Sequence, residues 1–522
     1  MASPLTALII LDGWGLADPA KPGNAITPKT APNFFSWFKK YPHTSLAASG
    51  SAVGLFPHQE GNSEAGHLNI GAGRVVKQDT LYVSEAIKDG SFFKNNAFHE
   101  ALHHVKKYES SVHVMGLLSN HDSAHSRPEH LYALLELFSA HDIKKVFLHL
   151  FTDGRDSGQH DALGHLRRLR AHFTGPEQIA TVMGRLYGMD RNKNWHRTKA
   201  AYEAMVLGKG HAVASAEEAI EQAYNRGESD EFIAPSVVEA CGKPIATIKS
   251  NDAIFFFNLR SDRARQITKA FVQPHFEEEN DESFVRAKKP RNIRFVALTD
   301  FGPDLPGILT AFPSRDVHNS LGRVLCPRRQ LYLAESEKFA HITYFLNGGY
   351  AQHFCDERWV KIASDRVKDF EIDPLMKAKE IGDYAVRAIE SKNFDFIAIN
   401  FANADMVGHT GNLAAAEKGV GAIDRALGRI VKTIGAIGGI CAITADHGNA
   451  EEMLNLKTDE VDSEHSINPV PFVLILPASH SRLVSVKAPK RLHPGKLADV
   501  APTLLKVMGI AKPKEMTGRA LF

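Results

Sequence analysis

The chain has 522 residues, of which 43% are hydrophobic and 23% are charged. These values lie close to those of ordinary globular proteins and exclude disordered and fibrous classes, and the length is enough for two to four domains at roughly 100 to 200 residues each. The 62 lysines and arginines nearly balance the 60 aspartates and glutamates, so the formal charge of +2 gives no electrostatic reason to expect nucleic acid as a partner.

The apolar runs are too short for a signal peptide or a membrane span. Residues 8–11 are stopped by Asp12 and follow no basic residue, unlike a signal peptide. The longest run, residues 434–443, falls well short of the roughly 20 residues that a membrane helix needs. The cysteines lie far apart without a Cys-x-x-Cys motif, which is typical of reduced cytosolic thiols; they are Cys241, Cys326, Cys355 and Cys441. We therefore expect a soluble, cytoplasmic protein that binds no membrane.

Short apolar runs that end in polar clusters predict buried strands. In chain order they span residues 7–11, 146–151, 254–258, 396–401 and 440–444. Continuously apolar strands imply sheets covered on both faces, and amphipathic stretches at 130–141 and 498–508 predict helices between them. The fold class is therefore α/β. Ligands of open α/β sheets bind beyond the carboxyl ends of the strands, which is where the polar clusters fall.

Two segments are predicted to connect domains. Residues 300–316 are rich in glycine and proline, and a second crossing is expected near residues 77–82. Together they predict a discontinuous outer domain of residues 1–77 and 312–522, with residues 78–311 inserted as a second domain.

Two pairs near the carboxyl end have the spacing of metal ligands. Asp405 precedes His409 by one helical turn, and Asp446 and His447 are adjacent at the end of a predicted strand. Each pair alone is more often structural, and His465 alone would more often be a loop residue. Carboxylates mixed with imidazoles suit Mn²⁺, Mg²⁺ or Zn²⁺.

Ser63 lies among small residues at a predicted helix start, where the simplest interpretation is a helix N-cap. A serine there also faces backbone N–H groups and the positive end of the helix dipole, which suits a group that carries phosphate. Its hydroxyl is a poor nucleophile unless a base or a metal activates it, and a two-metal site assists phosphoryl transfer.

Four motifs make the whole chain, from near residue 5 to near residue 510, resemble the cofactor-independent phosphoglycerate mutases of the alkaline-phosphatase superfamily. They are LDGWG at 11–15, GNSEAGHLNIGAGR at 61–74, DMVGHTG at 405–411 and TADHGN at 444–449. The resemblance implies a discontinuous alkaline-phosphatase-like domain with an inserted second α/β domain and an active site in the cleft between them.

The resemblance also implies the role of each metal-binding residue. Ser63 is expected to be the phosphorylated nucleophile at a site with two divalent metal ions, for which Mn²⁺ is the expected metal. One ion would be held by Asp12, Ser63, Asp446 and His447, and the other by Asp405, His409 and His465.

The central segment carries an arginine set that follows strand-like runs. Arginine supplies planar, bidentate donors, which a substrate with a phosphate and a carboxylate requires. The resemblance implies that these arginines grip 2- and 3-phosphoglycerate, with Lys338 near the transferring phosphate and with Asp156 and His125 contacting the glycerate hydroxyls and moving protons. The arginines are Arg155, Arg185, Arg191, Arg260 and Arg263.

The segment around His125 departs from the family pattern. The family usually has Asp-Gly-Gly-Val-His-Ser-His, whereas this chain reads NHDSAHSR at 120–127, one residue longer and without glycine. His121 is therefore a rival for the proton-transfer role.

The predicted function is the interconversion of 3-phosphoglycerate and 2-phosphoglycerate, a step of glycolysis and gluconeogenesis, by a monomeric isomerase through a phosphoserine. One alternative is a metal-dependent phosphatase or phosphopentomutase of the same superfamily. Another is a catalytically dead phosphate-binding protein, which the altered loop at 120–127 makes conceivable.

Overall fold

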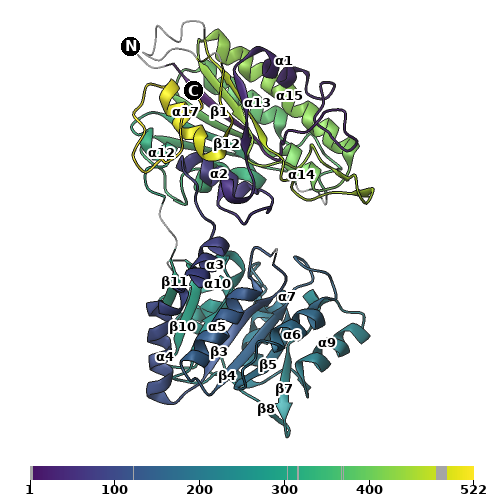
Figure 1. Cartoon of the computed structure of the whole chain (residues 1–522), viewed down its shortest axis with the longest axis vertical. Coiled ribbons are helices and arrows are strands. Elements are labelled where there is room, and N and C mark those ends of the chain that lie inside the picture. The colour runs from purple at the N-terminus through teal and green to yellow at the C-terminus, as the bar shows by residue number, and fades with distance from the viewer. Residues whose placement is uncertain are drawn as a thin grey trace. The chain divides into compact units, whose positions relative to one another are not determined.

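The computed structural model describes residues 4–121, 123–302, 304–313, 317–365, 367, 369–477, 489 and 491–522. Contacts divide the chain into two compact units, residues 1–78 with 316–522 and residues 79–315 (Figure 1). Residues 303 and 314–316 of the predicted linker, and Asp122 of the unusual loop, lie outside the described residues.

The first unit is built on an eight-stranded sheet with the order β13-β12-β14-β1-β15-β18-β2-β19. Its strands are β1 (Thr6–Leu11), β2 (His43–Ala47), β12 (Gln330–Glu335), β13 (Glu357–Ile362), β14 (Phe396–Phe401), β15 (Ile440–Thr444), β18 (Val470–Ile475) and β19 (Gly495–Lys496). Strand β1 runs parallel to β14 and β15 on either side, and β18 is antiparallel to both β15 and β2. All residues of β1, β14, β15 and β18 are buried, as expected for a sheet covered on both faces.

Helices cover both faces of this sheet (Figure 1). Contacts group α15 (Leu413–Ala436) with α1 (Pro32–Lys40) and α13 (Ala378–Glu390), and group α2 (Ser63–Ala72) with α12 (Leu321–Val324) and α17 (Val500–Val507). The remaining elements are α14 (Asn403–Gly408), the short helices η1 (Gly50–Val53), η4 (Ser336–Lys338), η5 (His341–Phe345) and η6 (Leu497–Asp499), and the hairpin of β16 (Leu454–Asn455) and β17 (Glu460–Val461).

The second unit contains a nine-stranded sheet with the order β11-β10-β9-β3-β4-β5-β7-β6, and β8 pairs with β7. Its strands are β3 (Val112–Leu118), β4 (Val146–Thr152), β5 (Glu177–Gly184), β6 (His211–Val213), β7 (Ser236–Ala240), β8 (Lys243–Pro244), β9 (Ala253–Phe256), β10 (Arg294–Thr299) and β11 (Ile308–Phe312). The strands from β11 to β5 are parallel to their neighbours, and β7 is antiparallel to β5.

Two apolar clusters fill this unit, and its helices pack around them. The helices are α3 (Asp79–Asp89), η2 (Phe92–Lys94), α4 (Asn96–Tyr108), α5 (Pro128–Ala140), α6 (Ala162–Arg170), α7 (Arg185–Gly188), α8 (Trp195–Leu207), α9 (Ala216–Asn225), η3 (Asp230–Phe232), α10 (Ser261–Val272) and α11 (Phe276–Glu279). Among the residues described, no helix is both long and apolar enough to cross a membrane.

The predicted α/β class is confirmed. The five predicted strands correspond to β1, β4, β9, β14 and β15, and the two predicted helices to α5 and to η6 with α17. Strand β11 ends at Phe312 and therefore crosses the predicted junction between residues 311 and 312.

The prediction of four reduced cysteines is wrong for two of them. Cys326 and Cys355 form a disulfide with their Cα atoms 5.8 Å apart, while Cys241 and Cys441 are free. The two bonded cysteines are separated by 29 positions in the sequence, and the fold brings the loop after α12 next to the loop before β13. Cysteine spacing alone carries no sign of this proximity.

Candidate functional site

The residues predicted to bind metal gather at the carboxyl edge of the first unit's sheet. Parallel register sets Leu11 beside Phe401 and Ile10 beside Thr444, so the residues that follow β1, β14 and β15 leave the sheet at the same edge. Asp12 follows β1 directly, α14 carries Asp405, and Asp446 and His447 follow β15. All four side chains are buried.

Ser63 is the first residue of α2, and Asn62 is its N-cap. The Asn62 side chain accepts a hydrogen bond from the Ala65 N–H at 2.8 Å, so the simple interpretation of Ser63 as the cap is wrong. The Ser63 hydroxyl instead donates to Asp12 Oδ1 at 3.1 Å and lies 3.0 Å from His447 Nε2. Because Asn62 does the capping, the Ser63 oxygen is available for chemistry.

Lys338, at the end of η4, also contacts the Ser63 hydroxyl. Its ammonium nitrogen lies 2.7 Å from Ser63 Oγ, 2.6 Å from Asp12 Oδ1 and 2.6 Å from Asp405 Oδ2. Burial alone would lower the pKa of Lys338, but the carboxylates of Asp12, Asp405 and Asp446 raise it above its ordinary value. The lysine therefore remains charged next to the serine hydroxyl.

The imidazoles are oriented by backbone carbonyls. Nδ1 of His409 lies 2.7 Å from the Ser463 carbonyl oxygen, and Nδ1 of His465 lies 2.8 Å from that of Gly61. Their Nε2 atoms are 3.1 Å apart and lie 3.3 Å (His409) and 3.2 Å (His465) from Asp405 Oδ1. Carbonyl contacts at Nδ1 are the usual way in which proteins aim Nε2 at a metal.

His447 lies among three carboxylates. Its Nε2 lies 3.4 Å from Asp12 Oδ1, 3.5 Å from Asp446 Oδ2 and 3.8 Å from Asp405 Oδ1. Burial lowers the pKa of His447, but these carboxylates outweigh it and raise that pKa to about 10. An imidazole surrounded in this way binds either a proton or a metal ion, so the two compete.

The donor set fits divalent metal ions. Asp12, Asp446 and His447 bring ligand atoms within 4.8 Å of one another, and so do Asp405, His447 and His465. Asp405 Oδ1 and Asp446 Oδ2 are buried among imidazole nitrogens 3.2 to 3.8 Å away, none of which makes a well-aligned hydrogen bond to them among the described residues. Hard oxygens combined with imidazole nitrogens suit Mn²⁺ or Zn²⁺.

Glu451 is a buried carboxylate that the sequence did not single out. Its Oε2 accepts hydrogen bonds from the backbone N–H groups of Gly15 and Asn449, both at 2.9 Å, and its Oε1 accepts from Asn468 Nδ2 at 3.0 Å and from the Ser466 hydroxyl. It thereby ties together the loops that follow Asp12, His447 and His465. No spacing pattern could have revealed it, because these partners come from three separate segments.

In the second unit, Arg185 joins the predicted Asp156 to a second acidic residue, Asp153. The buried guanidinium lies 2.5 Å from Asp153 Oδ1 and 2.9 Å from Asp156 Oδ1. Asp156 Oδ2 also accepts a hydrogen bond from the Ser123 hydroxyl at 2.7 Å. Burial raises the pKa of Asp156, but Arg185 outweighs this effect and lowers that pKa below its ordinary value.

His125 is buried beside this pair. Burial and the nearby charge of Arg185 lower the pKa of His125 to about 4, so the ring is neutral at pH 7. Its Nδ1 has no hydrogen-bond partner among the described residues. His121, by contrast, is 61% exposed and lies 2.8 Å from Glu129 Oε1. The altered loop therefore holds His125, and not His121, close to Arg185.

The other arginines of the set are close enough to influence one another. Burial, together with the charges of Arg185, Arg191 and Arg155, lowers the pKa of Arg263. Arg191 pairs with Asp262 Oδ2 at 2.6 Å, and Arg260 lies 3.6 Å from Asp262 Oδ1. Arg155 is half exposed and lies 3.5 Å from Glu231 Oε1. A cluster of this kind attracts an anion.

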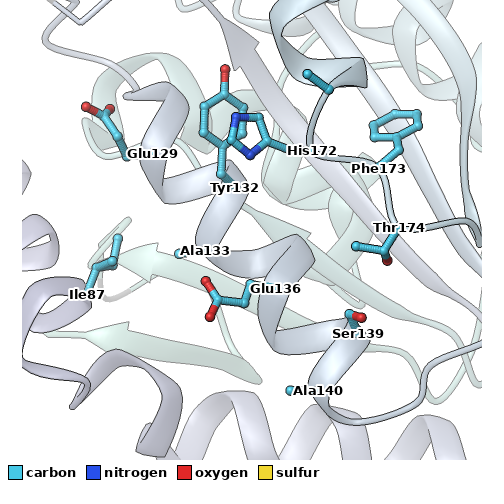
Figure 2. A pocket seen from close by; sticks show the side chains of 11 residues that line it. Ile87, Glu129, Tyr132, Ala133, Glu136, Ser139, Ala140, His172, Phe173 and Thr174 are labelled. Atoms are coloured by element: carbon cyan, nitrogen blue, oxygen red, sulfur yellow. The ribbon is translucent and has the colours of Figure 1, made fainter.

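A separate pocket of about 690 Å³ opens between α5 and the residues that follow α6. Figure 2 shows the stacked rings of Tyr132 and His172, whose centroids are 3.7 Å apart, with Glu129 and Glu136 on the same helix as Tyr132. None of the predicted site residues lines this pocket.

Comparisons with known proteins agree with the predicted family. Residues 83–303 match the family model described as the BPG-independent PGAM N-terminus. The 2,3-bisphosphoglycerate-independent phosphoglycerate mutase of Clostridium acetobutylicum is 43% identical over 100% of both chains, and enzyme 2 of Methanosarcina barkeri is 46% identical over 99% of this chain and 98% of its own. The crystal structure of Leishmania mexicana phosphoglycerate mutase at low cobalt concentration is similar, with a TM-score of 0.77 and 27% identity over 100% of this chain and 98% of that one. The chain therefore belongs to the family of 2,3-bisphosphoglycerate-independent phosphoglycerate mutases.

Proposed function

We propose that the chain interconverts 3-phosphoglycerate and 2-phosphoglycerate by passing the phosphoryl group through Ser63. The observation that carries this proposal is the position of the Ser63 hydroxyl, between the Lys338 ammonium at 2.7 Å and the Asp12 carboxylate at 3.1 Å. The carboxylate accepts the hydroxyl hydrogen, and the ammonium stabilises negative charge on the serine oxygen. The N-terminus of α2 adds backbone N–H groups suited to a bound phosphoryl group.

Two divalent ions would be held in the first unit, one by Asp12, Ser63, Asp446 and His447 and the other by Asp405, His409 and His465. When bound, such ions neutralise charge on the attacking and leaving oxygens of a phosphoryl transfer. Mn²⁺ is the metal that we expect, because mixed carboxylate and imidazole ligands accept it readily.

We assign the glycerate-binding role to the second unit. Arg155, Arg185, Arg191, Arg260 and Arg263 would hold the carboxylate and phosphate of the substrate. The cluster suits an anion because arginine forms bidentate hydrogen bonds with both groups. The phosphatase-like role belongs to the unit formed by the two ends of the chain.

The protons balance over the two half reactions. In the first, the Ser63 oxygen forms a bond to phosphorus, the bond from phosphorus to the substrate oxygen breaks, and the proton lost by Ser63 ends on that oxygen. In the second, the other glycerate hydroxyl attacks the phosphorus of the phosphoserine, the bond from phosphorus to the Ser63 oxygen breaks, and the proton of the attacking hydroxyl ends on Ser63. The lowered pKa values of His125 and Asp156 leave both groups unprotonated at pH 7, so the pair can take a proton from the attacking hydroxyl and deliver it in the reverse direction.

We further propose that the protein is a cytoplasmic monomer whose partners are its small-molecule substrates. The near-neutral charge offers no electrostatic footprint for nucleic acid. The disulfide between Cys326 and Cys355 is unusual for a cytosolic protein.

The test is an enolase-coupled assay of the purified protein with 3-phosphoglycerate and Mn²⁺, without 2,3-bisphosphoglycerate. Formation of 2-phosphoglycerate that disappears on chelation and returns with Mn²⁺ supports the proposal. Release of inorganic phosphate as the main product would indicate a phosphatase. A need for 2,3-bisphosphoglycerate, or full activity without metal, contradicts it.

A further inference from the structure

His67 and Asn400 lie between two carboxylates of the proposed metal site, those of Asp12 and Asp446, without being among its proposed ligands. Asn400 Nδ2 lies 2.8 Å from Asp12 Oδ2 and 3.0 Å from His67 Nε2. His67 Nδ1 in turn lies 2.9 Å from the Ser63 carbonyl oxygen and 3.2 Å from Asp446 Oδ2. Both side chains are buried, so no solvent competes for these contacts.

The direction of each hydrogen bond in this chain follows from the carboxylate at its end. Asp12 Oδ2 accepts only, so the Asn400 atom that faces it must be the amide nitrogen. The same nitrogen has its second N–H available for His67 Nε2, which must therefore accept. Nδ1 of His67 then carries the hydrogen and donates to the Ser63 carbonyl. The ring is thus held in one neutral tautomer.

Asn400 keeps this orientation at a cost. Its Oδ1 is buried without a hydrogen-bond partner among the described residues. Rotating the amide would place Oδ1 against the Asp12 carboxylate, and that repulsion outweighs the unsatisfied carbonyl. A buried amide kept in this orientation indicates that its N–H groups are needed.

The contacts join three elements that are far apart in the sequence. Asn400 lies on β14, His67 lies one turn after Ser63 on α2, and Asp446 follows β15. The chain of contacts therefore fixes the first turn of α2 relative to the sheet edge that carries Asp12 and Asp446.

We propose that His67 and Asn400 are positioning residues that hold Asp12, Ser63 and Asp446 in the arrangement that binds a divalent ion. This inference rests on the proposed function, because it takes these three residues as ligands. Hydrogen-bonding partners of metal ligands typically contribute 10- to 100-fold to metal affinity.

The test measures Mn²⁺ affinity by titration of metal-free protein, with thermal unfolding in EDTA as a separate measure of folding. Asn400→Leu and His67→Leu should each raise the apparent Kd about 10- to 100-fold. The double variant should bind Mn²⁺ with about the same Kd as the single variant that binds it less tightly, because each change breaks the same connection. His67→Asn, whose amide nitrogen occupies the place of Nδ1, should lose less affinity than His67→Leu.

His341→Leu is the matched control. His341 is another histidine whose ring centroid lies 5.7 Å from that of His67, but its Nδ1 has no hydrogen-bond partner among the described residues. We expect its Kd for Mn²⁺ to stay within about threefold of wild type. If a leucine variant does not fold, Asn400→Ser and His67→Ala serve for the same comparison.

Three results would overturn the inference: both single variants within threefold of wild type, effects that multiply in the double variant, or an equal loss in His341→Leu. A wild-type protein that binds no Mn²⁺ and has no mutase activity would overturn the proposed function and this inference with it. Intact wild-type binding with unaffected variants would overturn this inference alone.

Discussion

The ammonium nitrogen of Lys338 lies 2.7 Å from the hydroxyl oxygen of Ser63, and both side chains are buried. The two residues are 275 positions apart in the sequence, and the whole second unit, residues 79–315, lies between them in the chain. This contact joins the proposed nucleophile to the one lysine for which we propose a role in the transfer.

Replacing Lys338 should reduce turnover strongly. Lys338→Met removes the charge next to the Ser63 oxygen and leaves the carboxylates of Asp12 and Asp405 without their cation, so we expect kcat to fall at least about 100-fold. Lys338→Arg should also be impaired, because a planar guanidinium does not reproduce the compact ammonium.

The control for this measurement is Lys379→Met. Lys379 is 81% exposed on α13 and pairs with Asp383 at 2.9 Å. Such surface pairs contribute little, so its kcat should stay within about twofold of wild type. Equal activity of Lys338→Met and wild type would exclude Lys338 from the reaction.

His125 and His121 should respond differently to the same change. His125→Asn should lower turnover strongly while Mn²⁺ binding survives, because the buried ring lies near Arg185 and Asp156 and is no proposed metal ligand. His121→Asn should be mild, because His121 is exposed and pairs with Glu129. Steady-state kinetics with metal content measured alongside would separate the two. A severe defect only in His121→Asn would move the proton-transfer role to that residue, and two mild variants would leave Asp156 as the acid and base.

Glu335 should make the protein less stable as pH rises through neutrality. Burial raises the pKa of Glu335 to about 7, and its Oε1 has no hydrogen-bond partner among the described residues. The folded state therefore holds a proton that the unfolded state releases near pH 4.5. The contribution of this proton to the free energy of unfolding is complete below the unfolded pKa and is lost as pH rises through the folded pKa of about 7. The total loss levels off at about 3 kcal/mol at higher pH.

Glu335→Gln keeps the size of the side chain and removes the titration. Its melting temperature should exceed that of wild type at pH 8 and should differ little at pH 5, because the wild-type carboxyl is protonated there. Glu390→Gln, on an exposed residue of α13, serves as the control. The same pH dependence in wild type and Glu335→Gln would show that Glu335 does not cause it.

The disulfide predicts a thiol count and a loss of stability on reduction. Under denaturing, non-reducing conditions only Cys241 and Cys441 should react with a thiol reagent, and all four cysteines should react after reduction. Closing a loop of this length stabilises the folded state by about 3.5 kcal/mol in the chain-entropy model. Cys326→Ser should therefore lower the melting temperature, and Cys241→Ser should not. Four reactive thiols in the untreated protein would contradict the pairing.

The sequence was most informative where a residue follows a strand. Asp12, Asp405 and Asp446 come directly or within a few residues after β1, β14 and β15, and parallel register brings such positions together at one edge. Motif order supplied the rest of the ligand set, and the α/β class followed from the apolar runs.

The supporting contacts could not be predicted in this way. Asn400 lies within a buried strand, and whether its amide contacts Asp12 depends on which face of the sheet its side chain points to. Glu451 and the pair Cys326–Cys355 depend on loops that approach each other only in the fold. Asn62 took the capping position because its side chain, one residue before the helix, reaches the Ala65 N–H.

Transfer through Ser63 is tested by mixing the Mn²⁺-loaded protein with 3-phosphoglycerate, quenching with acid within one turnover, and mapping phosphate by mass spectrometry of the digested chain. We expect phosphate on Ser63 that appears before 2-phosphoglycerate and is absent in Ser63→Ala, whose α2 remains capped by Asn62. Phosphate on another residue, or wild-type turnover in Ser63→Ala, would contradict the claim that the phosphoryl group passes through this serine.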